Sequence, residues 1–223
     1  MSSSITPEIS AGSQSCEKRL SRRERRCAET RERLIEHALR LFSERGFAET
    51  TVEDITNAAD VGKGTFFNYF PSKEHILIHL RQLKRGKFRG MLLRALHSAE
   101  PMHRVILKLV LTLNKEFADS PALVRSILVP LFSSESMREQ MADDLEADRL
   151  VLAELMAARQ QQGEIRDDLP PIELALQFQQ ALIGTTVLWA LNPSRPLPDC
   201  LKEMTNVLWS GIRAPQTDGQ KSG

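Results

Sequence analysis

The chain has 223 residues, of which 41% are apolar, 5% aromatic and 26% charged, values typical of a soluble globular protein of one or two domains. Glycine and proline, 11 of each, exclude a collagen-like or fully disordered chain, and the low aromatic content disfavours a large β-sandwich or barrel. The net charge of +1 is uneven, because residues 1–90 contain 17 Lys and Arg against 12 Asp and Glu, while the remainder contains 13 against 17. This distribution predicts a polyanionic partner for the N-terminal part.

The N-terminal 22 residues are expected to form a disordered basic arm. Residues 1–20 are rich in Ser, Thr, Gly and Pro and have no apolar period. A basic run follows, made of Lys18, Arg19, Arg22, Arg23, Arg25 and Arg26. Such a run either contacts phosphates or is a solvated charge cluster, and the sequence leaves both interpretations open.

The first strong helical pattern covers residues 28–45, where Leu34, Ala38, Leu41 and Phe42 form one apolar stripe. Gly46 is expected to stop this helix. The run Thr50-Thr51-Val52-Glu53 fits a capping box and predicts the start of a second, short helix. A break at residues 60–62 then predicts a third short helix that ends before Pro71.

The rest of the chain also has helical periodicity. Ser72 is expected to cap a long helix over residues 73–97. Further helices are predicted at residues 102–118, 121–132, 136–162, 171–191 and 197–212, separated by proline- and glycine-containing breaks. No alternating strand pattern persists, so the predicted fold class is all-α.

The two short helices after residue 50, together with the helix before them, predict a helix-turn-helix unit. The second helix of such a pair can enter a DNA major groove, and Lys63, Thr65, Asn68 and Tyr69 offer donors and acceptors for that purpose. Gly64 permits close approach of the backbone to a phosphate, and Thr51 and Lys73 can add phosphate contacts. Helix-turn-helix pairs also occur as plain packing units, so spacing alone leaves both readings open.

The stretch TRERLIEHALRLFSERGFAETTVEDITNAADVGKGTFFNYFPSKEHIL resembles the DNA-binding domain of the TetR family of bacterial transcription regulators. The resemblance implies a homodimer whose recognition helices, at about residues 62–69, enter successive major grooves of operator DNA. It implies base contacts by Lys63, Gly64, Thr65, Asn68 and Tyr69, and phosphate contacts by Thr51 and Lys73. It further implies a repressor with a DNA-binding domain over residues 23–73 and a helical ligand-binding and dimerisation domain over residues 74–213. Residues 214–223 are expected to be a disordered tail.

The segment 171–191 is apolar nearly all around the helix, so it must bury more than one face. This segment and the helix at 197–212 together resemble the last two helices of the family. In dimers of the family, those two helices form a four-helix bundle with the same two helices of the partner. The expected dimer interface consists of Ala181, Gly184, Thr185, Leu201, Met204 and Leu208. The alternative is that both helices belong only to the core.

The family resemblance also implies control by a small molecule. Candidate pocket residues are Asn114, Phe117, Phe132, Met137, Gln177, Phe178, Thr185 and Trp189. Because charged residues are few on these helices, we expect an apolar or aromatic effector. The alternative is that these side chains are ordinary core residues.

Other functions have weaker support. His75 and His79 have the i, i+4 spacing of metal ligands, but no third ligand follows, so neither a metal site nor an enzyme is predicted. No nucleophile, nucleotide or dinucleotide motif is found, which predicts no catalytic residue and no cofactor. The three cysteines suggest no disulfide framework, and no signal peptide or membrane span is recognised, so we expect a cytoplasmic protein. A DNA-coating protein without sequence preference is the remaining rival, although its charge would be spread over the whole chain.

Overall fold

The computed structural model describes residues 21–118, 120–133 and 135–214, and within these ranges it is helical, with one isolated β-bridge between Ile165 and Arg213. The predicted all-α class is confirmed. The helices are α1 (Arg22–Arg45), α2 (Val52–Ala58), α3 (Lys63–Tyr69), α4 (Glu74–Leu96), α5 (Met102–Leu113), the 3₁₀-helix η1 (Lys115–Phe117), α6 (Pro121–Ser133), α7 (Glu135–Gln161), α8 (Pro171–Leu191) and α9 (Leu197–Ile212). The predicted arm at residues 1–20 and the tail from residue 215 lie outside the described residues.

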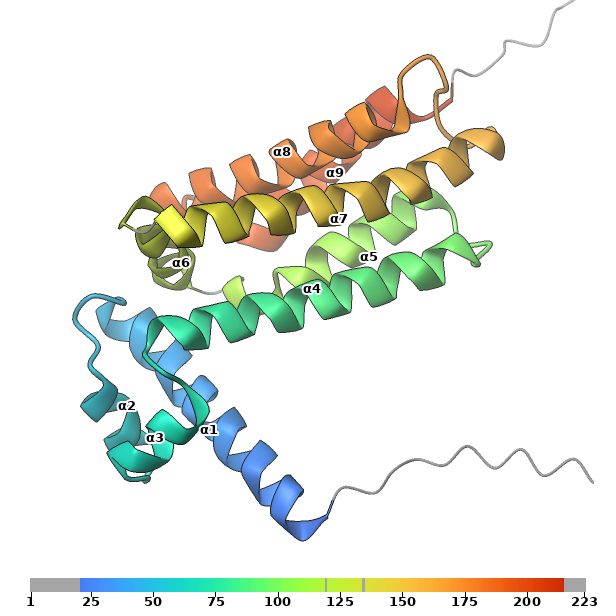
Figure 1. The fold of residues 1–223 in the computed structure, drawn as a ribbon. Coiled ribbons are helices and arrows are strands. Elements are labelled where there is room, and N and C mark those ends of the chain that lie inside the picture. Colours follow the sequence, from blue (N-terminus) through green and yellow to red (C-terminus); the bar gives the residue numbers. More distant parts are fainter. Residues whose placement is uncertain (1–20, 119, 134, 215–223) are drawn as a thin grey trace, which may run out of the picture.

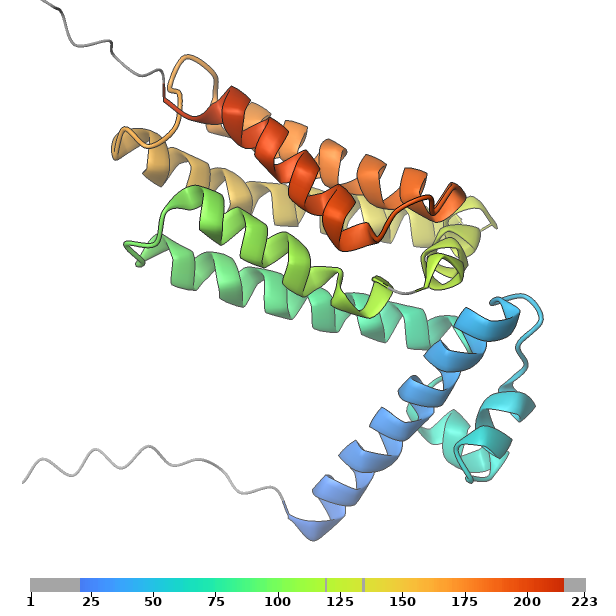
Figure 2. The same ribbon diagram turned by 180° about the vertical axis from the view of Figure 1, so that it is seen from behind.

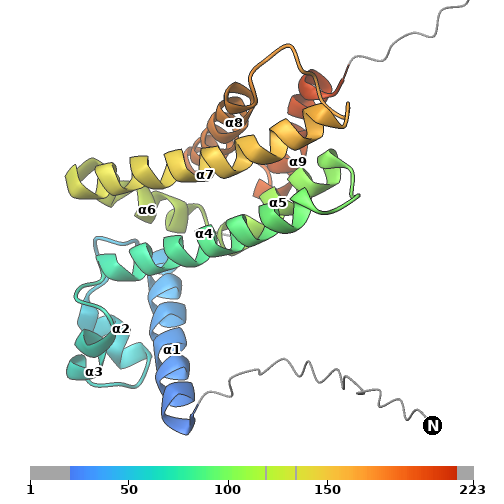
Figure 3. The ribbon, with the colours of Figure 1, turned by 45° about the vertical axis from the view of Figure 1, so that its right-hand side comes forward.

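The molecule has two parts, a small head and a larger helical body (Figure 1). Helices α1, α2 and α3 form the head, and α1 extends away from the body so that its first turns stand apart from it (Figure 3). In the body, α7 lies between α4 and α8, and α9 packs against both α8 and α5 behind α7 as seen in Figure 1 (Figures 1 and 2). Helix α1 contacts the body through α6, where the hydroxyl groups of Ser43 and Ser120 are 2.5 Å apart.

Three large side chains, one from each helix, fill the centre of the head. Phe42 of α1, Ile55 of α2 and Phe66 of α3 are fully buried. Gly46 ends α1 with a φ of 88°, a left-handed conformation that favours glycine. The chain can therefore reverse there and place Phe47 against Phe42, with ring centroids 5.0 Å apart. This packing fixes where α3 sits relative to α1.

Helix α1 begins at Arg22, six residues before the predicted start at residue 28. Ser21 and Glu24 form a capping box, in which the Ser21 hydroxyl accepts from the Glu24 N–H at 3.2 Å and the Glu24 carboxylate accepts from the Ser21 N–H at 2.8 Å. The basic run conceals this cap in the sequence. As a result Arg22, Arg23 and Arg26 lie on the first turns of α1.

The capping box of α2 is also shifted from the prediction, by one residue. Thr51, not Thr50, is the N-cap, and its partner is Asp54, not Glu53. The Thr51 hydroxyl accepts from the Asp54 N–H at 3.1 Å, and the Thr51 N–H donates to the Asp54 carboxylate at 2.9 Å. Thr50 is buried instead, with its hydroxyl on the carbonyl of Gly46 at 2.8 Å.

Two further boundaries differ from the prediction. Helix α4 begins at Glu74 with Lys73 as N-cap, and the Ser72 hydroxyl contacts the side chains of Glu74 and His75 instead of capping the helix. The single helix predicted over residues 102–118 is α5 followed by η1. The break falls at Asn114, whose side-chain amide donates to the Val110 carbonyl at 2.9 Å and so competes with the regular helical pattern.

Candidate nucleic-acid interface and internal cavity

Helix α3 has one side buried in the core of the head and an outward side that is largely polar. Phe66 faces the core, whereas Lys63, Gly64 and Asn68 are exposed. Phe67 has 54% of its surface exposed and lies beside this group. The sequence prediction omitted Phe67, although two adjacent phenylalanines on one helix cannot both face the same core. The outward surface of α3 therefore combines an ammonium, an amide and an aromatic ring.

The start of α3 is joined to α2 by an ion pair. The Lys63 ammonium lies 2.8 Å from the Glu53 carboxylate, and both side chains are more than half exposed. Such an exposed pair is weak and salt-dependent. Lys63 can therefore exchange Glu53 for a phosphate or a base edge.

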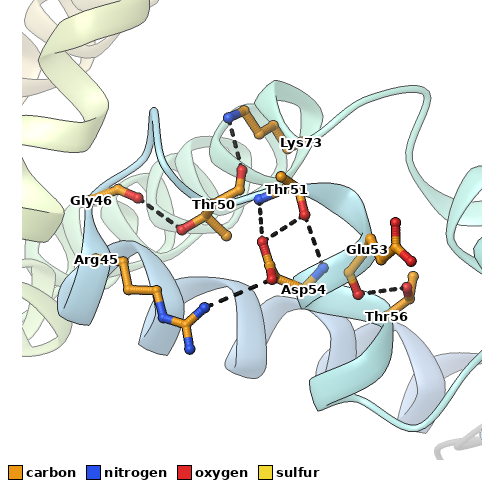
Figure 4. Close-up of polar contacts among 8 residues, drawn as sticks. All are labelled: Arg45, Gly46, Thr50, Thr51, Glu53, Asp54, Thr56 and Lys73. Atoms are coloured by element: carbon orange, nitrogen blue, oxygen red, sulfur yellow. Dashed lines mark hydrogen bonds and ion pairs between the residues drawn. The ribbon is translucent and has the colours of Figure 1, made fainter.

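Thr51 and Lys73, which were predicted to hold phosphates, have partners within the protein (Figure 4). The Thr51 hydroxyl and N–H are both bound to Asp54. The Lys73 ammonium donates to the carbonyl oxygens of Phe47 at 2.8 Å, Ala48 at 3.2 Å and Thr50 at 2.8 Å, and it lies 4.6 Å from the ring centroid of Phe47. An ammonium has three N–H donors, so these three carbonyls can accept from all of them, and Lys73 holds the loop between α1 and α2.

Tyr69 and Thr65 are half-buried, unlike the other predicted base-contacting residues. A hydrogen bond with the Cys27 thiol, together with burial, raises the pKa of Tyr69. The guanidinium of Arg31 lies 5.7 Å from the centre of its ring. Tyr69 therefore packs against α1, at a surface hollow that is also lined by Arg22, Arg23, Arg26, Cys27 and Thr30. Sequence reasoning did not place these arginines beside the end of α3.

The body contains an apolar cavity of about 270 Å³, partly open to solvent, between α4, η1, α6, α7 and α8. Of the eight predicted pocket residues, Asn114, Phe117 and Phe178 line it. Gln177 is exposed, Trp189 is buried beyond the cavity with its indole N–H on the Arg195 carbonyl at 2.8 Å, and Thr185 and Met137 are not among the lining residues. The side chain of Phe132 lies outside the described part of the structure.

The cavity face of α8 consists of Phe178, Gln179, Leu182, Ile183, Thr186 and Val187. Gln177 points away from this face and Thr185 lies at its edge. Trp189 continues the stripe of Phe178 and Leu182 along the helix, beyond the end of the cavity. Because α8 is apolar nearly all around, its periodicity does not show which face points inward.

One wall of the cavity is charged, which corrects the expectation of sparse charge. Arg81 and Arg85 on α4 face Asp144 and Asp148 on α7. Arg81 lies 3.0 Å from Asp144, Arg85 contacts Asp144, and Arg85 donates to Asp148 at 3.2 Å. Burial raises the pKa of Asp148 even though Arg85 opposes the shift. In the sequence, the two arginines are four residues apart, and so are the two aspartates. This matched spacing is the signal that could have indicated ion pairs between α4 and α7.

Lys84 adds a further buried cation to this wall. Its ammonium donates to the Leu113 carbonyl at 2.5 Å, lies 3.1 Å from Glu116 and sits 3.5 Å from the centre of the Phe117 ring. Burial lowers the pKa of Lys84, and Glu116 opposes that effect. The cavity wall therefore joins α4 to η1 as well as to α7.

The predicted dimer residues divide between the core and the surface. Leu201 is buried in the core, and Met204 and Leu208 pack partly against it, whereas Ala181, Gly184 and Thr185 are half-buried on α8. The assignment of Leu201 to the dimer interface is wrong, because its side chain is buried within the single chain and has no surface to offer a partner. The most exposed apolar side chains on α8 and α9 are Leu188, Leu191 and Val207, which the prediction omitted.

Helix α8 is long and apolar enough to span a membrane by length and composition, contrary to the prediction that no segment would be. Within this fold, however, it packs against α6, α7 and α9. Its apolar character is explained on one side by these contacts. On the other side, Leu188 and Leu191 remain exposed in the single chain.

His75 and His79 have separate surroundings. His75 contacts the Ser72 hydroxyl at 3.0 Å, and His79 lies against the ring of Phe70, with centroids 6.0 Å apart. Burial and the charge of Arg31 lower the pKa of His79. Within residues 21–118, 120–133 and 135–214, no three His, Cys, Asp or Glu side chains are grouped to hold a metal ion.

Comparison with known proteins gives matches over both the head and the body. Residues 34–80 match the family model described as bacterial regulatory proteins, tetR family. The chain is 28% identical to the HTH-type transcriptional regulator EthR of Mycolicibacterium smegmatis, over 73% of this chain and 75% of the relative. It is also 28% identical to the fatty acid metabolism regulator protein of Bacillus subtilis, over 80% of this chain and 93% of the relative.

A solved structure extends the match to the fold. The crystal structure of Thermus thermophilus FadR, a TetR-family transcriptional repressor in complex with lauroyl-CoA, is similar with a TM-score of 0.58 and 29% sequence identity. The similarity covers 84% of this chain and 97% of that one. The relation therefore includes the helical body in addition to the DNA-binding head.

Proposed function

We propose that the chain is a member of the TetR family of bacterial regulatory proteins, as its matches indicate, and that it is a repressor that binds operator DNA as a homodimer and releases it when an effector enters the body. The observation that carries this proposal is the outward surface of α3. Lys63, Asn68 and Phe67 are exposed there on a helix that Phe66 anchors in the core. A polar, rigidly held helix of this kind suits direct reading of base edges in a major groove.

The proposed dimer is supported by the uncovered apolar face of α8 and α9. Leu188 and Val207 have 68% and 67% of their surfaces exposed in the single chain. Exposed apolar patches of this kind favour a protein partner, and a two-fold homodimer is the commonest oligomer. Two copies would present two α3 helices to half-sites about 34–36 Å apart along the DNA.

The proposed effector site is the cavity of the body. Its aromatic and aliphatic lining favours a ligand with an apolar portion. The lauroyl-CoA complex of the Thermus relative supports the same class, because it pairs a similar body with a ligand that has an apolar chain. Control then requires that the effector bind the DNA-releasing conformation more tightly than the DNA-binding one.

Helix α4 is the proposed route between the cavity and the head. Its first residues follow Lys73, which holds the loop before α2, and Arg81, Lys84 and Arg85 further along the helix line the cavity. A ligand that displaces these three side chains would move the segment that positions the head. A bacterial regulator of chromosomal DNA would act in the cytoplasm.

Selection of bound sequences from a random DNA pool tests the proposal. We expect wild-type protein to enrich a pseudo-palindromic site and to prefer it by about 10³-fold or more over bulk DNA. The K63A/N68A variant is expected to lose this preference, whereas K108A, which removes an exposed lysine from α5 in the body, is expected to retain it. Binding of all sequences with equal affinity would support a DNA-coating protein instead and would overturn the proposal.

A further inference from the structure

Two arginines of the cavity wall have a buried nitrogen that lacks a hydrogen-bond acceptor. They are Arg81 on α4 and Arg149 on α7, and in each the unpartnered atom is Nε. The Arg81 Nε lies 3.0 Å from an Asp144 oxygen, but the geometry does not form a hydrogen bond. Buried polar groups nearly always have partners, so two orphan donors on one cavity wall require an explanation.

The acids nearby do not provide that partner. Asp144 is shared between Arg81 and Arg85, and Asp148 accepts from Arg85. The ion-pair partner of Arg149 is Glu146, one turn earlier on the same helix and half exposed. Asp144 therefore serves two guanidinium groups, and neither the Arg81 Nε nor the Arg149 Nε has a hydrogen-bond acceptor.

The buried charges of the cavity wall would lower the stability of the fold if the cavity were only part of the core. Burying charged groups in apolar surroundings requires compensation, and apolar replacements of similar volume are often as stable or more stable. The opposite side of the same cavity is apolar, with Phe117, Phe178 and Leu182. The charged wall holds three arginines together with Asp144 and Asp148, and its guanidinium groups face apolar side chains, an arrangement that suits a ligand with two chemically different ends.

We propose that the cavity binds an amphipathic anion, with its acidic head group on Arg81 and Arg149 and its apolar chain among Phe117, Phe178 and Leu182. The inference rests on the proposed function, in which the cavity is the effector site. Guanidinium groups are suited to this task because they donate to carboxylates and phosphates in a fixed, planar geometry. Because Arg81 is on α4 and Arg149 is on α7, the head group would bind between the helix that leads to the DNA-binding head and its neighbour.

The shared chemistry is an apolar chain with an anionic, oxygen-bearing head group, which free carboxylates and phosphate-containing thioesters both possess. The test is calorimetric titration of the full chain, below the aggregation concentration of each probe, with four ligands that have the same twelve-carbon chain. They are laurate, lauroyl-CoA, 1-dodecanol and dodecyltrimethylammonium. Laurate or lauroyl-CoA is expected to bind at least about tenfold more tightly than the neutral alcohol, consistent with a charge-assisted contact.

Two variants assign the head group to its residues. R81Q/R149Q is expected to lose the preference for the anion over 1-dodecanol. R104Q, which removes an exposed arginine from α5, is the matched control and is expected to keep that preference. If R81Q/R149Q does not fold, the comparison of the four probes on wild-type protein still decides the question.

The outcomes separate this inference from the proposed function. Preference for laurate supports a carboxylate head group, and preference for lauroyl-CoA supports a phosphate-containing one. Equal affinity for the alcohol and both anions, preference for the cation, or binding of none of the four overturns the inference. The DNA selection described above decides the proposed function independently of these titrations.

Discussion

The ammonium group of Lys73 donates a 2.8 Å hydrogen bond to the carbonyl oxygen of Thr50, which immediately precedes the N-cap of α2. The N-cap residue of α4 is thereby tied to the loop that leads into the helix-turn-helix pair. Lys73 also binds two other carbonyls of the same loop, so its side chain acts as a brace within the protein. We therefore expect Lys73 to position this loop and not to bind a DNA phosphate.

We expect the K73A variant to lower the free energy of unfolding by about 1–3 kcal/mol, because partly buried carbonyl oxygens lose their donor. Thermal or urea unfolding measures this change. The affinity for the selected DNA site is expected to fall while the slope of log K against log salt stays the same, since no phosphate contact is removed. A decrease of about 0.9 in that slope would instead show that Lys73 neutralises a phosphate.

The T51A variant tests the corrected capping box of α2. Removing the hydroxyl that accepts from the Asp54 N–H is expected to lower the free energy of unfolding by about 1 kcal/mol. The E53A variant is the control, because Glu53 forms only an exposed ion pair, and it is expected to change stability by less than about 1 kcal/mol. A larger effect of E53A than of T51A would restore the original Thr50–Glu53 assignment.

The same cap predicts how the free energy of unfolding changes with pH. Hydrogen bonds from Thr51 lower the pKa of Asp54 in the folded protein. Asp54 therefore contributes stability above the ordinary pKa of an aspartate, and this contribution is lost as the pH falls through the lowered value. Urea unfolding across the acidic range is expected to show the difference between wild type and T51A shrinking at the lowest pH. A constant difference would contradict the proposed role of Asp54.

The basic turn of α1 predicts an effect on the salt dependence of DNA binding. Arg22, Arg23 and Arg26 lie beside Tyr69 at the end of α3, where they are placed to approach the DNA backbone. The R22Q/R23Q/R26Q variant is expected to reduce the slope of log K against log salt, by up to about 0.9 for each phosphate contact that is lost. Titrations of labelled DNA at several salt concentrations measure this slope.

A matched control separates a local contact from a general change in charge. R104Q/K108Q/K202Q removes three exposed cations from α5 and α9, in the body of the molecule. It is expected to leave the slope almost unchanged. Equal effects of the two triple variants would assign the basic turn to a solvated charge cluster.

Much of the helical fold follows from local sequence signals. Pro121, Pro171 and the turn before Leu197 mark the starts of α6, α8 and α9, because proline is favoured in the first turn of a helix and ends the preceding segment. The start of α1 was missed because the Ser21–Glu24 cap lies within a charge run that resembles a disordered arm. Pattern alone therefore located the helices better than it located their caps.

The candidate sites were predicted unevenly for physical reasons. The polar residues of α3 could be identified because their motif is local and continuous in sequence. The cavity wall could not, because charges at helical spacing usually face solvent, and only the packing of α4 against α7 buries Arg81 with Asp144. Lys73 shows the same limit, since its three acceptors lie 23 to 26 residues earlier in the chain.

The uncovered face of α8 and α9 predicts that assembly can be disrupted without unfolding the chain. The L188E/V207E variant places two charges at positions that are already exposed in the single chain, so its helices are expected to remain folded. Burial of these charges in a dimer interface would be strongly unfavourable. The variant is therefore expected to be monomeric by light scattering and to bind the selected DNA site at least about tenfold more weakly, because two half-sites are no longer bound together.

The matched control is L150E, which introduces a charge at an apolar residue of α7 with 52% of its surface exposed. It is expected to remain dimeric and to bind DNA as wild type does, since Leu150 lies outside the α8 and α9 face. A monomeric wild-type protein, or a L188E/V207E variant that stays dimeric, would place the dimer interface elsewhere. Circular dichroism of both variants confirms that any loss of DNA binding arises from assembly and does not reflect loss of helix.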